Sequence, residues 1–307
     1  MKESIDISIV IVNYNVKDLV LACLKSIYAL TNPALRLEIF VVDNDSKDGS
    51  KTAIPEAFPQ IHFIDNNFNA GFPAANNQAF KLAQGRYIFM LNPDTELKDD
   101  SIGKLYQYLE ASTQVDMCAP KLLNSDLSFQ QSVWRFPTLT SIFLEMHYLH
   151  ALNGKKDYRD QNFQESFSAE SVSGAAIFFR TELLESVGYL DEKMFWIEDI
   201  DFCYRAVKTG NTLMYLPEAT VVHHIGQSAK KNYNISISNQ IWNKIKFFRK
   251  HYSAGATFLV KCMSAYHVVI KFVMFSLMSP FSVIYQRKAS AYVYTFKRVF
   301  NPPDGIQ

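Results

Sequence analysis

The chain has 307 residues, of which 48% are apolar and 20% charged, enough for one ordinary domain and a smaller appendage. Its glycine and proline contents exclude a collagen-like or broadly disordered protein, and its four cysteines lack the spacing of a disulfide or zinc framework. The net charge of +1 conceals an asymmetry, because residues 230–307 carry twelve Lys or Arg and only one acid. Such a basic segment is typical of a region that meets an anionic partner.

The first third of the chain alternates apolar strands with helices. Strands are expected at residues 7–12, 37–42, 61–64 and 86–91, and helices at 16–30 and 72–84. The first strand is apolar except for Ser8, which is typical of a strand buried on both faces of a parallel sheet. It is also too short for the apolar core of a signal peptide. The alternation predicts βαβ units and a parallel sheet.

Polar turns follow the first, second and fourth of these strands. Parallel strands bring their carboxyl ends to one edge of a sheet, where ligands bind in open α/β folds. We therefore expect one ligand cleft at this edge, lined by Tyr14, Asp43 and Asp94.

The middle of the chain, residues 122–170, is less regular. Regular elements return with a strand at 173–179, a helix at 181–187 and a strand at 212–216. Between the last two lies an acidic segment that includes Glu198 and Asp199.

The basic C-terminal segment combines helical periodicity with long apolar stretches. Residues 256–285 form a largely apolar stretch that is broken by Lys261, His267 and Lys271, and the longest run without charge after Lys271 is 272–285. This run is shorter than the roughly 20 residues that span a bilayer. We expect helices that lie in the membrane interface, with basic side chains near anionic headgroups. A transmembrane hairpin and a soluble helical cap are the alternatives.

Several polar residues are candidates for a catalytic site. Asp94 follows an apolar strand directly and could hold Mg²⁺ or Mn²⁺ against a diphosphate, although Asn92, Pro93 and Asp94 also favour a simple turn. Asp43 could bind a base or ribose or merely cap its turn, and Tyr14 could stack on a base or pack.

The acidic segment and the two adjacent histidines allow similar alternatives. Glu198 and Asp199 lie beside aromatic residues, where a carboxylate can be tuned to act as a general base, or they start a solvated helix. His223 and His224 follow a strand and could ligate a metal, contact a phosphate or be structural.

Eight motifs in one order resemble the family 2 glycosyltransferases with the GT-A fold, most of all their non-processive, rhamnosyltransferase-like branch. The matching pieces extend from residue 7 to residue 228, three quarters of the chain. They are residues 10–15, 41–50, 69–72 with Asn76 and Asn77, 91–95, 173–175, 187–192, 198–201, and His223 with Gly226 and Ser228. Two positions depart from the pattern: Asn92 replaces the first acid of the DxD motif, and Ala79 stands where relatives often carry glycine.

The resemblance implies a role for each matching residue. Asp199 would deprotonate the acceptor hydroxyl with Glu198 as its helper, and Asp94 with His223 would hold Mg²⁺ or Mn²⁺. The residues implied to bind the nucleotide-sugar are Val12, Tyr14, Asp43, Asn69, Gly71, Asn92 and Gly174.

The resemblance also implies the architecture and the activity. It implies a Rossmann-like, mostly parallel α/β sheet flanked by helices in residues 1–230, with a donor half to about 120 and an acceptor half from 121, followed by a helical membrane-associating extension at 231–307. The enzyme would be an inverting, metal-dependent hexosyltransferase that uses a nucleotide-diphosphate-sugar and a lipid-linked or polysaccharide acceptor in cell-surface glycan synthesis. From the basic, apolar tail we expect a cytoplasmic protein that is peripherally attached to the inner face of the cell membrane, with no nucleic-acid partner and with a homodimer possible. The alternative is a non-catalytic nucleotide-sugar-binding or scaffold protein of the same fold.

Overall fold

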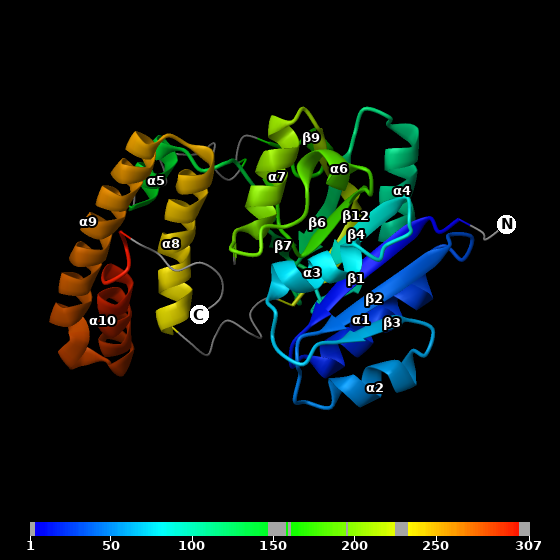
Figure 1. Ribbon diagram of the computed structural model, residues 1–307, viewed down its shortest axis with the longest axis horizontal. Coiled ribbons are helices and arrows are strands. Elements are labelled where there is room, and N and C mark those ends of the chain that lie inside the picture. Colours follow the sequence, from blue (N-terminus) through cyan, green and yellow to red (C-terminus); the bar gives the residue numbers. More distant parts are fainter. Residues whose placement is uncertain (1–3, 147–157, 159–160, 195, 225–232, 301–307) are drawn as a thin grey trace. The chain divides into compact units, whose positions relative to one another are not determined.

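A computed structural model describes residues 4–146, 158, 161–194, 196–224 and 233–300 (Figure 1). The chain divides into two compact units, the first formed by residues 1–135, 157–192 and 198–225 and the second by 136–156, 193–197 and 226–307. The boundary expected near residue 230 lies outside the described residues. Segments 136–156 and 193–197, expected in the first domain, group with the C-terminal helices.

The first unit is built around one large mixed sheet whose main strand order is β3-β2-β1-β4-β11-β6-β12-β5. Its strands are β1 (Ile7–Asn13), β2 (Leu37–Asp43), β3 (His62–Asp65), β4 (Tyr87–Leu91), β5 (Thr95–Leu97), β6 (Met117–Leu123), β7 (Phe129–Gln130), β9 (Phe167–Ser168), β11 (Ala176–Arg180) and β12 (Leu213–His223). Strands β8 (Val133–Trp134) and β10 (Ser171–Val172) form a separate pair.

The predicted α/β sheet is confirmed, and its first four strands are parallel as expected. Asn13 of β1 lies opposite Asp43 of β2, and Ile11 of β1 lies opposite Leu91 of β4, so these strands end at the same edge of the sheet. Beyond β4 the sheet is mixed, because β11 runs antiparallel to both β4 and β6. A strand that is buried on both faces is apolar whether it pairs in parallel or antiparallel, so the sequence of β11 does not predict its direction.

Helices cover both faces of the sheet (Figure 1). Ile9 and Ile11 share one apolar cluster with side chains from α1, α2 and α4, whereas the ring of Phe179 on the other face lies 5.8 Å from Phe80 of α3 and 5.4 Å from Phe202 of α7. Each such buried side chain stabilises the fold by about 1.5–3 kcal/mol. The helices are α1 (Lys17–Leu30), α2 (Ser50–Ala57), α3 (Phe72–Phe80), α4 (Ser101–Ala111), α6 (Leu183–Val187) and α7 (Glu198–Lys208).

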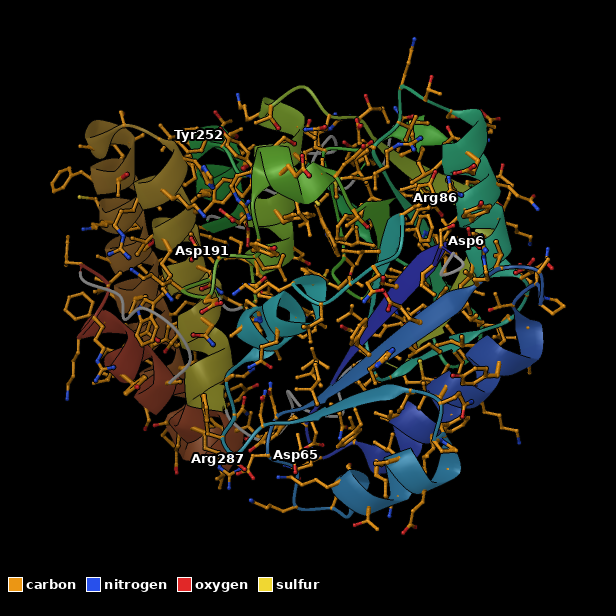
Figure 2. All side chains as sticks on the ribbon, turned by 45° about the vertical axis from the view of Figure 1, so that its right-hand side comes forward. Asp6, Asp65, Arg86, Asp191, Tyr252 and Arg287 are labelled. Carbon is orange, nitrogen blue, oxygen red and sulfur yellow. The ribbon has the colours of Figure 1, made fainter. Side chains whose placement is uncertain are left out.

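The amino end of the sheet is closed by its own polar contacts. Asp6, just before β1, forms ion pairs with Arg36 at 3.4 Å and with Arg86 at 3.6 Å. Gly85 approaches the β1 backbone so closely that a Cβ atom there would lie 2.5 Å from the amide nitrogen of Ser8. Asp65 marks the opposite, carboxyl end of the parallel strands, where the polar turns lie (Figure 2).

The second unit is helical in the residues described, with α5 (Leu139–Met146), α8 (Tyr233–His251), α9 (Ala254–Met278), a 3₁₀ turn (Ser279–Phe281) and α10 (Val283–Phe296). Helices α8 and α10 are joined by a 2.7 Å hydrogen bond between the hydroxyls of Ser238 and Thr295. Phe275 of α9 stacks on Tyr292 of α10, with ring centroids 5.8 Å apart. The helical periodicity expected in this part of the chain is therefore present.

Candidate active site at the carboxyl end of the sheet

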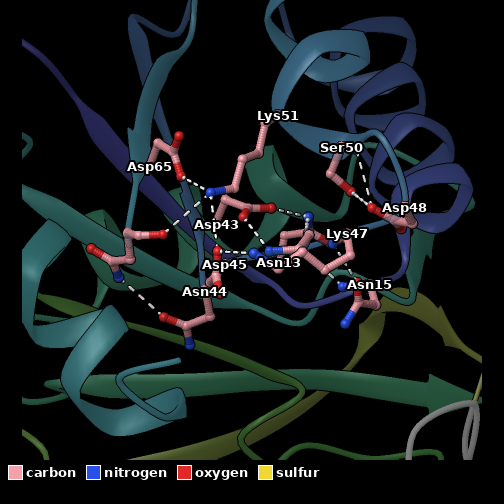
Figure 3. Close-up of polar contacts among 12 residues, drawn as sticks. Asn13, Asn15, Asp43, Asn44, Asp45, Lys47, Asp48, Ser50, Lys51 and Asp65 are labelled. Atoms are coloured by element: carbon pink, nitrogen blue, oxygen red, sulfur yellow. Dashed lines mark hydrogen bonds and ion pairs between the residues drawn. The ribbon is translucent and has the colours of Figure 1, made fainter. Parts of the chain in front are cut away.

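Asp43 lies at the end of β2, opposite Asn13 at the end of β1. Its carboxylate is fully buried, with Oδ2 accepting a 2.6 Å hydrogen bond from Asn13 and Oδ1 a 2.8 Å hydrogen bond from the Ser46 amide (Figure 3). The side chain thus holds the turn that joins the two strand ends. Its contact with a nucleotide stays a prediction.

Around this turn lies a charged cluster that the sequence analysis did not single out. Lys51 Nζ lies 2.6 Å from Asp65 and 3.3 Å from Asp45 (Figure 3). Hydrogen bonds from Lys47 and Lys51 lower the pKa of the Asp45 carboxyl below its usual value. The polar run 43–50 was the available signal, but only the fold shows that Asp65 of β3 joins it. Tyr14, which follows Asn13 in sequence, is 47% exposed, so its ring is accessible to a planar ligand.

Three other predicted nucleotide-binding residues, Val12, Asn69 and Gly71, lie inside β1 or in the loop before α3. Val12 is a buried residue of β1. Asn69 Oδ1 accepts a 2.9 Å hydrogen bond from the Gly71 amide, and Gly71, with φ +87°, precedes α3. A positive φ is where glycine is favoured, so this loop has a backbone that few other residues would adopt without strain.

Asp94 and His223 come together although they are far apart in sequence. Asp94 Oδ1 lies 3.3 Å from Nε2 of His223, the last residue of β12, and the Asp94 carbonyl accepts a hydrogen bond from the His224 amide. Asn92 Nδ2 lies 3.4 Å from the same Nε2. Gly226 and Ser228, which belong to the same motif, lie outside the described residues.

These side chains fit a hard divalent cation that retains water and substrate ligands. They supply a carboxylate oxygen and an imidazole nitrogen at one point, and the buried Oδ1 of Asn92 has no hydrogen-bond partner. Mg²⁺ is usually bound by one or two carboxylates plus substrate phosphates. Within the described ranges no cluster of three or more His, Cys, Asp and Glu side chains exists, so a complete protein cage is absent there.

Asp199 lies at the start of α7, and both of its carboxylate oxygens accept backbone hydrogen bonds. Oδ2 accepts from the Gly174 amide at 2.8 Å and Oδ1 from the Ile200 amide at 2.7 Å. Burial raises the pKa of Asp199 above its ordinary value of 3.8, while these two amides oppose the shift. The preceding residue, Glu198, is buried as well.

A short path of hydrogen bonds and backbone connects Asp199 with the Asp94–His223 pair. The Asn92 amide donates a 2.9 Å hydrogen bond to the carbonyl of Ala175, next to Gly174. The approach at Gly174 is close, because a Cβ atom there would lie 3.2 Å from Cβ of Asp199. The structure therefore brings Asn92, Gly174 and Asp199 together at the end of β4 and the start of β11.

Comparison with known proteins identifies the family. The model of the family described as Glycosyl transferase family 2 matches residues 8–188, more than half of the chain. The chain belongs to glycosyl transferase family 2. The match includes Asp43, Asp94 and Gly174, and the resemblance found in the sequence is thereby confirmed.

Relatives of this family-2 chain act in glycan synthesis. It is 29% identical to the low-salt glycan biosynthesis hexosyltransferase Agl10 of Haloferax volcanii, over 66% of this chain and 61% of the relative. It is 24% identical to the N-acetylglucosaminyl-diphospho-decaprenol L-rhamnosyltransferase of Mycobacterium tuberculosis, over 64% of this chain and 69% of the relative. It is also 24% identical to the dTDP-rhamnosyl transferase RfbF of Shigella flexneri, over 97% of this chain and 94% of the relative. The chain thus spans about three fifths of the archaeal relative and nearly all of the Shigella one.

Two solved glycosyltransferases share the fold. GalNAc-T7, crystallised with UDP, GalNAc and Mn²⁺, superposes with a TM-score of 0.63 over 98% of this chain and 57% of its own, at 15% identity. TarS of S. aureus gives a TM-score of 0.54 over 96% of this chain and 90% of the solved chain, also at 15% identity. At this identity the likeness establishes the fold alone.

Proposed function

We propose that the protein is an inverting glycosyltransferase that moves a sugar from a nucleotide-diphosphate-sugar to a hydroxyl of a lipid-linked or polysaccharide acceptor. The observation that carries this proposal is the backbone path joining Asp199, through Gly174 and Ala175, to Asn92 beside the Asp94–His223 pair. It supplies a candidate base and a candidate diphosphate site at one sheet edge. We assign this chemistry to the first unit.

In the proposed reaction, Asp199 accepts the proton of the acceptor hydroxyl as its oxygen bonds to the anomeric carbon. The bond from that carbon to the diphosphate breaks on the opposite face, and its electron pair leaves with the nucleotide diphosphate. One displacement inverts the anomeric configuration. The amides of Gly174 and Ile200 fix the carboxylate, and each of its oxygens keeps a further lone pair for the proton.

Asp94 and His223 would hold Mg²⁺ or Mn²⁺, with the side-chain oxygen Oδ1 of Asn92 beside them. When bound, such a cation would stabilise the negative charge that develops on the leaving diphosphate. The presence of Mn²⁺ in the crystals of GalNAc-T7 supports a divalent ion in this fold. Tyr14 and the Asp43 turn would face the nucleoside, with Asn69 and Gly71 on the neighbouring loop.

A thermal-shift screen with UDP-, dTDP- and GDP-sugars in Mn²⁺ tests the donor class. We expect one nucleotide class to raise the melting temperature, because a ligand that binds only the folded state at 100 times its Kd stabilises it by about 2.7 kcal/mol. The same donor should then release its nucleotide diphosphate when acceptor is added. Absence of any shift, with and without Mn²⁺, would contradict donor binding.

The C-terminal unit supports a second part of the proposal, attachment to a membrane. One face of α9 is buried in its unit, through residues such as Val260 and Val268, whereas another face exposes a row of apolar side chains. This row, the α9 stripe, consists of Leu259, Tyr266, Ile270, Val273 and Leu277. These residues follow one another at helical spacing, so the stripe is continuous along the helix.

We propose that the α9 stripe inserts into the interface of an anionic cytoplasmic membrane face. Helix α10 and the turn after it add the cations Arg287, Lys288, Lys297 and Arg298, which would lie near lipid headgroups. The helical residues Ala254–Phe281 are also long and apolar enough to cross a bilayer by length and composition, although 28% of the most apolar window is buried. The relative named as an N-acetylglucosaminyl-diphospho-decaprenol L-rhamnosyltransferase supports the proposal that this protein acts at a membrane.

Replacing Ile270 and Val273 together by Glu should lower the affinity for vesicles that contain anionic lipid, measured by co-sedimentation, by at least about 10-fold. The reason is that burying each side chain is worth about 1.5–3 kcal/mol. The matched control is Leu82→Glu, which changes a side chain of the first unit that is 54% exposed and should leave vesicle binding unchanged. Wild-type protein that stays with membranes in alkaline carbonate would favour a span. Wild-type protein that ignores the vesicles would overturn membrane attachment.

A further inference from the structure

A chain of side-chain hydrogen bonds runs from the β6–β7 connection to the His223 ring. Gln130 of β7 is almost fully buried, and its Oε1 lies 2.8 Å from Nδ1 of His223. Its Nε2 lies 2.9 Å from Oδ1 of Asn124 and 3.0 Å from the backbone carbonyl oxygen of His223. The Gln130 amide therefore bonds His223 both at the ring and at the backbone.

The orientation of these amides follows from the backbone groups that they face. Asn124 Nδ2 lies 3.3 Å from the carbonyl oxygen of Phe129, which can only accept, so the other end of the Asn124 amide is its oxygen. Gln130 Nε2 likewise faces two acceptors, the oxygen of Asn124 and the carbonyl of His223. Hence the atom of Gln130 that faces the His223 ring is a carbonyl oxygen. Since a carbonyl oxygen cannot donate, Nδ1 of His223 carries the hydrogen.

The neutral ring is thereby left with an unprotonated Nε2. This nitrogen lies 3.3 Å from Asp94 Oδ1 and can accept from Asn92 Nδ2 at 3.4 Å. A lone pair facing a carboxylate oxygen is unfavourable unless a positive charge lies between them, either a proton or a metal ion. We propose that Gln130 is a positioning residue that fixes the His223 tautomer, so that Nε2 and Asp94 together present two donor atoms to a divalent cation. The cation part of this proposal rests on the proposed function.

The neighbouring histidine is a built-in contrast. His224 makes a similar pair, with Nε2 lying 3.0 Å from Glu96, but its Nδ1 faces the hydroxyl of Ser125 at 2.7 Å. A hydroxyl can donate or accept, so it does not select a tautomer. At His224 the Glu96 carboxylate, which can only accept, faces Nε2, so only His223 has an obligatory acceptor at Nδ1. Mutating a residue that orients a metal-binding imidazole in this way typically changes metal affinity 10–100-fold.

The test is histidine ¹⁵N NMR of the metal-free full-length protein at a pH above imidazole titration, with the His223 signals assigned by their loss in His223→Gln. We expect wild-type His223 to carry its proton on Nδ1. Gln130→Leu should populate the other tautomer and weaken Mn²⁺ binding, measured by electron paramagnetic resonance, by about 10–100-fold. The control Gln131→Leu removes the adjacent side-chain amide and should change neither measurement.

A wild-type proton on Nε2 overturns the proposal, and this measurement does not depend on whether Gln130→Leu folds. An unchanged tautomer and unchanged Mn²⁺ affinity in folded Gln130→Leu would overturn it as well. If the tautomer behaves as expected but wild-type protein binds no Mn²⁺, Gln130 keeps its positioning role and the metal part of the proposed function fails.

Discussion

Asp199→Asn is expected to lower kcat by about 10²–10⁴-fold while leaving donor affinity unchanged, because an amide cannot take the acceptor proton. The substitution also removes one of the two oxygens that accept from Gly174 and Ile200, so a loss of about 1–3 kcal/mol of stability should accompany it. Kinetics therefore need to be measured below the melting temperature of the variant.

The pH profile provides a second readout of the same residue. Burial raises the pKa of Asp199 above the ordinary aspartate value of 3.8. As the pH is lowered, the base therefore becomes protonated, and kcat falls, at a higher pH than it would for an ordinary aspartate. The native state binds this proton more tightly than the unfolded chain. Its contribution to stability is therefore present below the unfolded pKa and is lost as the pH rises through the folded pKa. Fitting kcat against pH for the wild-type enzyme measures where that limb lies.

Asp18→Asn is the matched control for Asp199→Asn, since Asp18 is an exposed aspartate in the first turn of α1 and its loss should leave kcat unchanged. Full turnover by Asp199→Asn would reassign the base to another group. If every active-site variant and the wild-type protein lack transfer and donor hydrolysis, the non-catalytic alternative gains support.

Asp94→Ala should weaken Mn²⁺-dependent donor binding by at least about 100-fold, because it deletes the carboxylate that would neutralise the cation beside the diphosphate. Binding of the nucleotide without metal should change little. Isothermal titration with donor, in the presence and absence of Mn²⁺, separates these two terms.

The adjacent Glu96–His224 pair supplies the control for Asp94. Glu96 lies two residues further along and contacts its own histidine at 3.0 Å, so Glu96→Gln alters a similar carboxylate–imidazole contact on the same segment. It should leave the Mn²⁺ dependence intact. Equal losses in both variants would indicate a general effect on this edge of the sheet instead of a metal site at Asp94.

Local sequence patterns predict the parallel half of the sheet well. Strands β1, β2 and β4 are mostly apolar runs that end at polar turns, so their positions and their shared carboxyl edge follow from residues 7–12, 37–42 and 86–91. The start of α7 near the acidic segment is similarly local, because Glu198 and Asp199 favour the first turn of a helix.

The rest depends on contacts between distant parts of the chain, which periodicity does not encode. Gln130 lies 93 residues before His223, and nothing in the run around Gln130 marks it as a hydrogen-bond partner of an imidazole. The reversal of β11 and the use of both Asp43 oxygens within the turn are likewise products of the assembled sheet. The family motifs located the candidate residues, but only the fold shows which side chains hold them.

A crystal structure with Mn²⁺ and a nucleoside diphosphate, with the metal located by its anomalous scattering, is the most direct test. The account predicts one manganese peak at bonding distance from Asp94 and His223 Nε2, with the diphosphate on the metal and the Asp199 carboxylate facing the space where the sugar would lie. A metal bound elsewhere, or a nucleotide bound away from the end of β4 and the start of β11, would contradict it.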